Sequence, residues 1–154
     1  MGSLRDEIKQ AGPWSSREQE AFLNLLRTAD TLARGEVTLL KNANLSPNQY
    51  NALRILRGAG ADGVSCSELG NRLIERDPDV TRLIDKLEER GLMARTRDAR
   101  DRRVYRNVIT EAGLDLLASL DAPIVAIHRK QLGHLGDEKL NALIRLLEEA
   151  RTNP

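Results

Sequence analysis

The residues of this sequence that could do chemistry are concentrated in one arginine-rich stretch near its middle. Between Arg90 and Arg106 seven arginines stand against two aspartates, while the whole chain has a formal net charge of only +1. A planar guanidinium donates forked, bidentate hydrogen bonds to phosphate oxygens and to base edges. The stretch therefore predicts contact with nucleic acid. The alternative is a solvated hairpin whose arginines pair with Asp98 and Asp101.

A second set of polar residues precedes this stretch on a predicted helix. Asp77 is a suitable N-cap and Pro78 suits the first helical position. Apolar residues then recur at helical spacing, at Val80, Leu83, Ile84 and Leu87, and the opposite face carries Asp79, Thr81, Arg82, Asp85, Lys86 and Glu89. Because Arg82 and Lys86 are four residues apart, they are neighbours on that exposed face, where either can donate to guanine or to phosphate.

The elements around these residues predict a helix-turn-helix followed by a β-hairpin. Residues 65–76 form a short helix opened by a capping box, with Leu69, Leu73 and Ile74 facing inward, and it nearly abuts the helix over residues 78–90. Gly91 is typical of a helix C-terminus, and residues 92–97 and 104–109 have the composition of strands. In such an arrangement the second helix enters the major groove and the hairpin is a wing.

Long amphipathic helices are predicted on both sides of this unit. One is capped by Ser15 with Glu18 and runs to Lys41, and Ser46 caps the next helix, with Gln49 reaching back. Residues 111–151 are predicted helical, with a kink or a restart at Pro123. The predicted fold is a single domain over residues 1–154, mainly α with a small β wing, in which residues 45–110 are the winged helix-turn-helix and residues 15–41 and 111–151 are dimerisation helices. A two-fold dimer would separate two recognition helices by roughly 34 Å.

Composition excludes several classes of protein. One cysteine rules out an intramolecular disulfide and fits a reducing cytosol, and no apolar run approaches the roughly 18 residues of a membrane span. Four aromatic residues are too few for a stacking platform that binds single strands, so duplex DNA is the favoured partner. No catalytic motif or nucleotide-binding loop stands out. The sequence predicts a cytoplasmic protein that is not an enzyme, carries no cofactor and has no membrane partner.

Cys66, His128 and His134 are the other residues with reactive or metal-binding side chains. A thiolate at Cys66 would be stabilised near a helix N-terminus, but without a second cysteine we favour core packing over redox sensing. The two histidines are six residues apart and do not share a helical face. A metal site would need Asp121, Asp137 or Glu138 across a dimer, so no metal is predicted.

The chain resembles the MarR family of bacterial winged helix-turn-helix transcription regulators over about residues 16–151. The most specific parts are the recognition-helix stretch DVTRLIDKLEERGL (79–92) and the wing DARDRRVYRNVITEAG (98–113). The wing fits the family's Asp-x-Arg-x-x-Arg signature with Asp98, Arg100 and Arg103. The segment LSPNQYNALRIL (45–56) is similar to the family's second helix.

The resemblance implies a homodimer that binds duplex DNA and represses transcription, with its interface made by the N- and C-terminal helices. The DNA-binding residues expected from it are Thr81, Arg82 and Lys86 in the major groove, Arg100 in the adjacent minor groove, and Arg102 and Arg103 beside it. Asp98 and Arg103 are expected to brace the wing by pairing with each other or with the backbone.

The family also implies a small aromatic or anionic effector in a cleft between the dimerisation helices and the DNA-binding unit. The sequence does not identify the effector-binding residues. Tyr50 and His128 are candidates by residue type and element alone.

One departure from the family concerns Asp79, where many relatives have Ser or Thr. A carboxylate there repels phosphate, but it favours a helix N-terminus or can accept a hydrogen bond from a cytosine amine. We favour the capping role and keep DNA contact as the alternative. Asp79, Asp85 and Glu89 on the exposed face also favour a second function, a winged-helix protein-interaction module without specific DNA binding.

Overall fold

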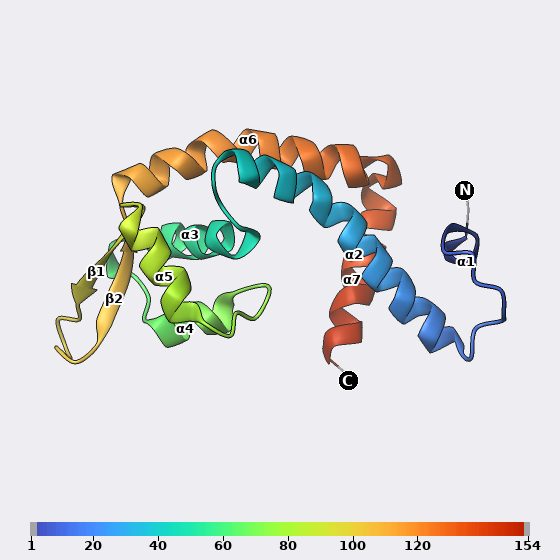
Figure 1. Cartoon of the computed structure of the whole chain (residues 1–154), viewed down its shortest axis with the longest axis horizontal. Helices are drawn as coiled ribbons and strands as arrows, with labels where there is room; N and C mark the ends of the chain where they lie inside the picture. The colour runs from blue at the N-terminus through green and yellow to red at the C-terminus, as the bar shows by residue number, and fades with distance from the viewer. Residues whose placement is uncertain (1–2, 153–154) are drawn as a thin grey trace. The chain divides into compact units, whose positions relative to one another are not determined.

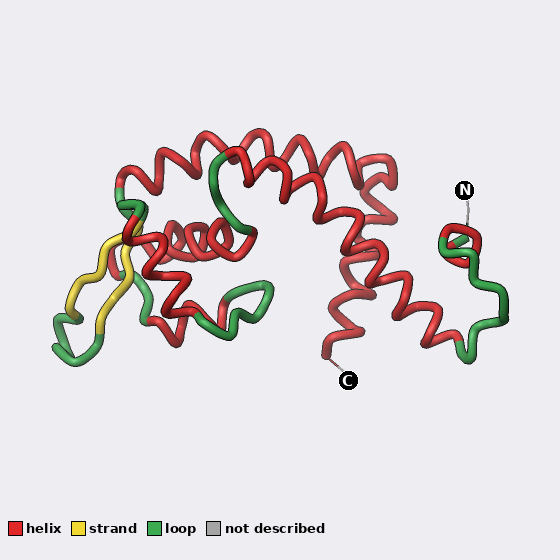
Figure 2. The backbone as a smooth tube through the Cα atoms, in the orientation of Figure 1, coloured by secondary structure: helices red, strands yellow, loops and turns green. Residues whose placement is uncertain are grey.

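The structure is a computed structural model that describes residues 3–152. It is mainly helical, with a two-stranded antiparallel sheet among the described residues (Figures 1 and 2), which confirms the predicted fold class. The elements in chain order are α1 (Leu4–Glu7), α2 (Arg17–Asn42), α3 (Pro47–Ala59), η1 (Gly60–Asp62), α4 (Cys66–Arg72), α5 (Val80–Glu89), β1 (Met93–Arg97), β2 (Tyr105–Ile109), α6 (Glu111–Leu132), η2 (Gly133–Leu135) and α7 (Gly136–Thr152).

The chain divides into two compact units, one up to Gly35 and the other from Glu36 onward. In the first unit Ser3 caps α1, and Glu7 forms an ion pair with Arg27 of α2, with 3.5 Å between Oε2 and Nε. The second unit contains the elements from α3 to α7. It therefore holds every residue of the predicted winged helix-turn-helix.

One apolar core organises the second unit. Its most buried side chains are Leu40, Leu53, Leu56, Leu69, Ile84, Leu87, Met93 and Leu117. These residues come from the end of α2, from α3, α4, α5 and β1, and from α6, so one core joins the two short helices through α3 to α6 (Figure 1). A bidentate ion pair between Arg57 of α3 and Asp121 of α6, at 2.8 and 2.9 Å, adds a polar link.

Two predicted capping boxes are present as expected. The Ser46 hydroxyl accepts from the Gln49 N–H at 3.1 Å, and the Gln49 side chain accepts from the Ser46 N–H at 2.9 Å. Ser65 and Glu68 repeat the arrangement at the start of α4, at 3.1 and 2.7 Å. These reciprocal bonds satisfy backbone donors that a helix N-terminus leaves without partners.

Two features of the long helices differ from the prediction. The cap of α2 is Ser16 rather than Ser15, because the Ser16 hydroxyl accepts from the Gln19 N–H at 3.1 Å while the Gln19 side chain reaches the Ser15 N–H at 2.8 Å. The helix also does not restart at Pro123, since α6 runs unbroken from Glu111 to Leu132.

The connection between α4 and α5 is longer than the sequence predicts. Helix α4 ends at Arg72 instead of Arg76, and α5 begins at Val80 instead of Pro78, so Asp79 and not Asp77 is the N-cap. The two helices are consequently separated by residues 73–79.

Side chains of α3 account for this difference. Asn51 Oδ1 accepts from the Ile74 N–H at 2.8 Å, and Asn48 Nδ2 donates to Asp77 Oδ2 at 3.1 Å. Such tertiary bonds compete with the local bonds that would continue a helix. Ile74, predicted to face inward, is 87% exposed as a result of the early helix end.

The hairpin agrees with the prediction to within one residue at each strand. Met93 pairs with Ile109 at one end and Arg97 with Tyr105 at the other. Val64 adds an isolated bridge to β2, exchanging backbone hydrogen bonds of 2.8 and 3.1 Å with Asn107, which is only 2% exposed. The wing is thereby attached to the segment just before α4.

Candidate nucleic-acid interface

The start of α5 is fixed by Asp79. Its Oδ1 accepts from the Arg82 N–H at 3.0 Å, which confirms the capping interpretation. Leu83, Ile84 and Leu87 are buried, so the opposite face of α5 carries Thr81, Arg82 and Lys86 into solvent. Because the buried face of α5 is held in the apolar core, these three side chains are positioned where they could reach the major groove of DNA.

The seven arginines between Arg90 and Arg106 fall into two groups, of which the first is held within the protein. Arg90 donates to the carbonyl oxygens of residues 43 and 44, and Arg95 pairs with Asp85 and Glu88 on α5. The Arg97 guanidinium lies 5.7 Å from the centroid of the Tyr105 ring. Arg106 pairs with Glu68 of α4 and Asp98 of the wing.

The second group is Arg100, Arg102 and Arg103, all on the loop of the wing. Their guanidinium groups have no ion-pair or hydrogen-bond partner among residues 3–152, and the same holds for the charged ends of Arg82 and Lys86. These cations are exposed and uncompensated, which is what binding to a polyanion requires. The alternative of a hairpin neutralised by its own aspartates holds for Arg106, which pairs with Asp98, but not for the three loop arginines.

The wing loop is organised around Asp98. Its Oδ1 accepts from the N–H groups of Arg100 and Asp101 at 2.7 and 3.2 Å, and its Oδ2 accepts from Arg106 Nε at 2.8 Å. The Arg100 N–H and the Arg106 guanidinium hold the pKa of Asp98 below its ordinary value of 3.8, so the carboxylate is charged at neutral pH. Of the two expected ways of bracing, the one through the backbone is present for Asp98, which does not pair with Arg103; the Arg103 N–H donates to Asp101 Oδ1 at 2.9 Å.

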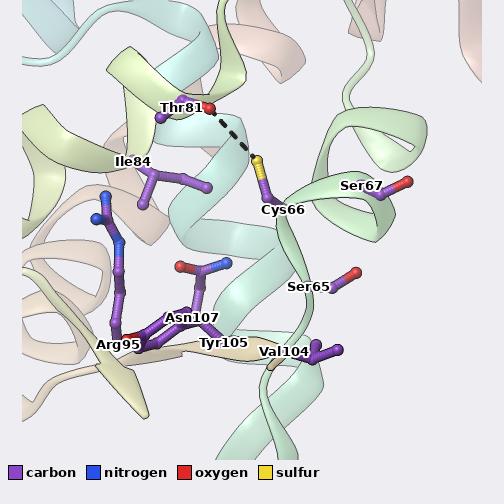
Figure 3. Close-up of a pocket in the computed structure, with 9 residues that line it drawn as sticks. All are labelled: Ser65, Cys66, Ser67, Thr81, Ile84, Arg95, Val104, Tyr105 and Asn107. Carbon is purple, nitrogen blue, oxygen red and sulfur yellow. Dashed lines mark hydrogen bonds between the residues drawn. The ribbon is translucent and has the colours of Figure 1, made fainter. Parts of the chain in front are cut away.

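A groove of about 330 Å³ lies between the start of α4, the exposed face of α5 and the wing (Figure 3). Its walls are Ser65, Cys66, Ser67, Thr81, Ile84, Arg95, Val104, Tyr105 and Asn107. Cys66 is exposed there, with its Sγ 3.9 Å from Thr81 Oγ1. Core packing of Cys66 was therefore a wrong expectation, because α4 presents this first residue outward while Leu69 occupies the core.

An accessible thiol at Cys66 gives a direct check on this geometry. We expect Ellman's reagent to titrate one thiol per chain in the folded protein, without denaturant, since Cys66 is the sole cysteine and is exposed. The Cys66→Ala chain is the control and should give no signal. A thiol that reacts only after denaturation would contradict the outward position of this residue.

Tyr50 and His128, the candidates for effector binding, lie outside the groove between α4, α5 and the wing. Tyr50 is 5% exposed, and burial raises the pKa of its hydroxyl above 10.0. His128 Nε2 lies 3.2 Å from Glu36 Oε2. The described residues contain no group of three or more His, Cys, Asp or Glu side chains placed to hold a metal ion, and none of their helices is long and apolar enough to cross a membrane.

Known proteins similar to this chain include members of one family of transcription regulators. The model of the MarR family matches residues 45–105, the span from just before α3 to the first residue of β2. Among solved structures, a MarR transcription factor from Planctomyces limnophilus is 43% identical, with a TM-score of 0.68 over 88% of this chain and 98% of that one.

Two further structures share the fold and were solved with bound molecules. The S. aureus MepR–DNA complex is 19% identical, with a TM-score of 0.77 over 86% of this chain and 98% of that chain. CouR from Rhodococcus jostii, bound to p-coumaroyl-CoA, is 25% identical, with a TM-score of 0.76 over 92% and 98%.

Proposed function

The chain belongs to the MarR family of transcription regulators, and on this premise we propose that it is a homodimeric, sequence-specific duplex DNA-binding repressor. Thr81, Arg82 and Lys86 of α5 would enter the major groove. Arg100 would enter the adjacent minor groove, with Arg102 and Arg103 beside it.

The observation that carries this proposal is that the cationic side chains of α5 and the wing fall into two groups, those with and those without a partner in the described part of the protein. Arg82, Lys86, Arg100, Arg102 and Arg103 carry charges without partners among residues 3–152, while the other arginines between Arg90 and Arg106 are held by carboxylates, carbonyls or a ring. Arginine on a wing loop suits a narrow, electronegative minor groove, which favours A·T-rich flanks. Asp98 would brace the wing through its three hydrogen bonds.

The acidic residues on α5 weaken the protein-interaction alternative. Asp79 Oδ1 is occupied in the helix cap and Asp85 is paired with Arg95, so Glu89 is the one residue of these three without a partner among the described residues. Direct contact of Asp79 with a cytosine amine stays a proposal, since its Oδ2 has no partner among the described residues.

Exposed apolar side chains on the flanking helices support the homodimer. Helix α2 exposes Phe22 and Leu26 at 58% and 54%, and α7 exposes Ile144 and Leu146 at 53% and 58%. Large apolar side chains in such numbers on helical faces are typical of surfaces that associate. A second copy of the chain is the partner proposed for them.

Regulation by a small aromatic or anionic effector in the cytoplasm completes the proposal. A ligand that binds more tightly to a dimer with unsuitable spacing of its recognition helices would release DNA. The bound p-coumaroyl-CoA of the Rhodococcus relative supports a search among such compounds.

The experiment is a fluorescence-anisotropy titration against duplexes tiled from the upstream region of the protein's own gene, with excess unrelated DNA, at 50 and 200 mM salt. Tight binding to one duplex that resists competitor supports a specific regulator. Weak binding to every duplex that vanishes with salt contradicts it and favours the interaction module. About eight phosphate contacts would lower affinity by several orders of magnitude over this range of salt.

Arg100→Ala tests the wing contact. We expect affinity for the identified duplex to fall by about 1 kcal/mol or more, and the slope of log Kd against log salt to drop by about one, because one cation leaves the minor groove. The loss should be larger on duplexes with A·T-rich flanks. Equal affinity and slope for parent and variant would remove Arg100 from the interface.

A further inference from the structure

Arg106 differs from its neighbours on the wing because it joins two elements that are far apart in sequence. Its Nη1 donates to Glu68 Oε2 at 2.6 Å, and its Nε donates to Asp98 Oδ2 at 2.8 Å. Glu68 belongs to α4 and Asp98 to the wing loop, so one guanidinium spans the gap between the helix-turn-helix and the wing.

Both carboxylates are themselves fixed. Glu68 Oε2 also accepts from the Ser65 N–H at 2.7 Å as part of the α4 capping box. Asp98 Oδ1 accepts from the N–H groups of Arg100 and Asp101. A continuous chain of hydrogen bonds therefore runs from the start of α4, through Arg106, to the backbone of the residue proposed to enter the minor groove.

The charge of Arg106 is already balanced within the protein. Two carboxylates share its guanidinium, whereas Arg100, Arg102 and Arg103 have no such partner among the described residues. A phosphate contact by Arg106 would have to break these bonds, while the three loop arginines can bind phosphate without breaking any.

We infer that Arg106 is a positioning residue: it fixes the wing loop against α4 so that Arg100 is already placed for the minor groove before DNA binds. The benefit is that less conformational entropy is lost on binding. This inference rests on the proposed function for its effect on DNA, but the ordering of the wing is a property of the free protein.

The first test uses the free protein. Hydrogen exchange measured by mass spectrometry should be faster in the wing peptide of Arg106→Gln, because the Arg100 and Asp101 amides lose their fixed acceptor. Arg102→Gln is the matched control and should exchange like the parent, since its guanidinium has no partner in residues 3–152. Equal wing exchange in Arg106→Gln and parent overturns the inference, whatever the protein binds.

Glu68→Gln separates the two ends of the link. Glutamine can still serve in a capping box, so α4 should keep its N-terminus while the ion pair to Arg106 is lost. We expect the hydrogen-exchange rate of the wing peptide in Glu68→Gln to lie between the rates of the parent and of Arg106→Gln, and the melting temperature to stay unchanged. A parent-like wing in Glu68→Gln would overturn the connection to α4.

The second test uses the duplex identified by the titration. Arg106→Gln should weaken binding about tenfold while leaving the salt slope nearly unchanged, because no phosphate contact is removed. The double variant with Arg100→Ala should bind no more weakly than Arg100→Ala alone, since Arg106 acts through Arg100. Independent, additive losses or a slope reduced by about one would show direct contact and overturn the inference.

Discussion

Gly113→Ala is expected to lower the free energy of unfolding by about 3 kcal/mol. The reason is the close approach of α6 to the chain just before β1. A Cβ at position 113 would lie 2.2 Å from the Leu92 carbonyl oxygen and 2.7 Å from Ile109 Cγ1. The oxygen of Leu92 cannot move away freely, because it also accepts from the Thr110 N–H at 3.1 Å. Urea unfolding at one fixed protein concentration measures the loss.

Gly58→Ala is the matched control for this prediction. Gly58 lies inside α3, where an added Cβ would meet nothing within 4 Å. Alanine should therefore stabilise the chain by about 1 kcal/mol, through helix propensity alone. A Gly113→Ala chain that unfolds at the urea concentration of the parent would contradict the packing of α6 on the residue 92 carbonyl.

Local chemistry predicted those elements whose causes lie within a few residues. The capping boxes at Ser46 and Ser65 and the left-handed glycine at Gly91, with φ of 68°, are in place because each needs only neighbours along the chain. The strands are correct to within one residue for the same reason. Local patterns also placed the apolar stripe of α5 against the core.

The turn between α4 and α5 could not be predicted in this way. Its shape depends on Asn48 and Asn51 of α3, which bond to residues 29 and 23 positions further along the chain. Sequence pattern alone gave Pro78 as the first helical residue, whereas the described turn extends to Asp79.

The candidate site shows the same limit. Charge counting found the arginine-rich wing but treated its seven arginines as one group. Which of them are free depends on distant partners, as with Arg106 and Glu68, which are 38 residues apart. The acidic residue Glu68 at a predicted helix start was the one hint in the sequence of a partner for Arg106. Its separation from Arg106 matches neither helix nor strand periodicity, so the pair could not be predicted.

Arg82→Ala should cost the largest share of DNA affinity, about 1 to 3 kcal/mol on the identified duplex. Arg82 lies in the first turn of α5, its backbone N–H is fixed by Asp79, and its guanidinium has no partner among the described residues. The substitution should leave the fold intact, because the side chain is exposed and alanine favours a helix. Anisotropy titrations on the identified duplex and on unrelated DNA measure the effect.

The two duplexes distinguish what Arg82 contacts. A bidentate bond to guanine predicts that the specific duplex loses most of the affinity, so that the ratio of specific to non-specific binding falls. A phosphate contact predicts equal losses on both duplexes and a salt slope lower by about one. Arg129→Ala, which removes an exposed charge from the last turn of α6, should change Kd by less than about twofold, since no phosphate contact is expected there. If Arg82→Ala behaved like Arg129→Ala, the exposed face of α5 would not be the recognition surface.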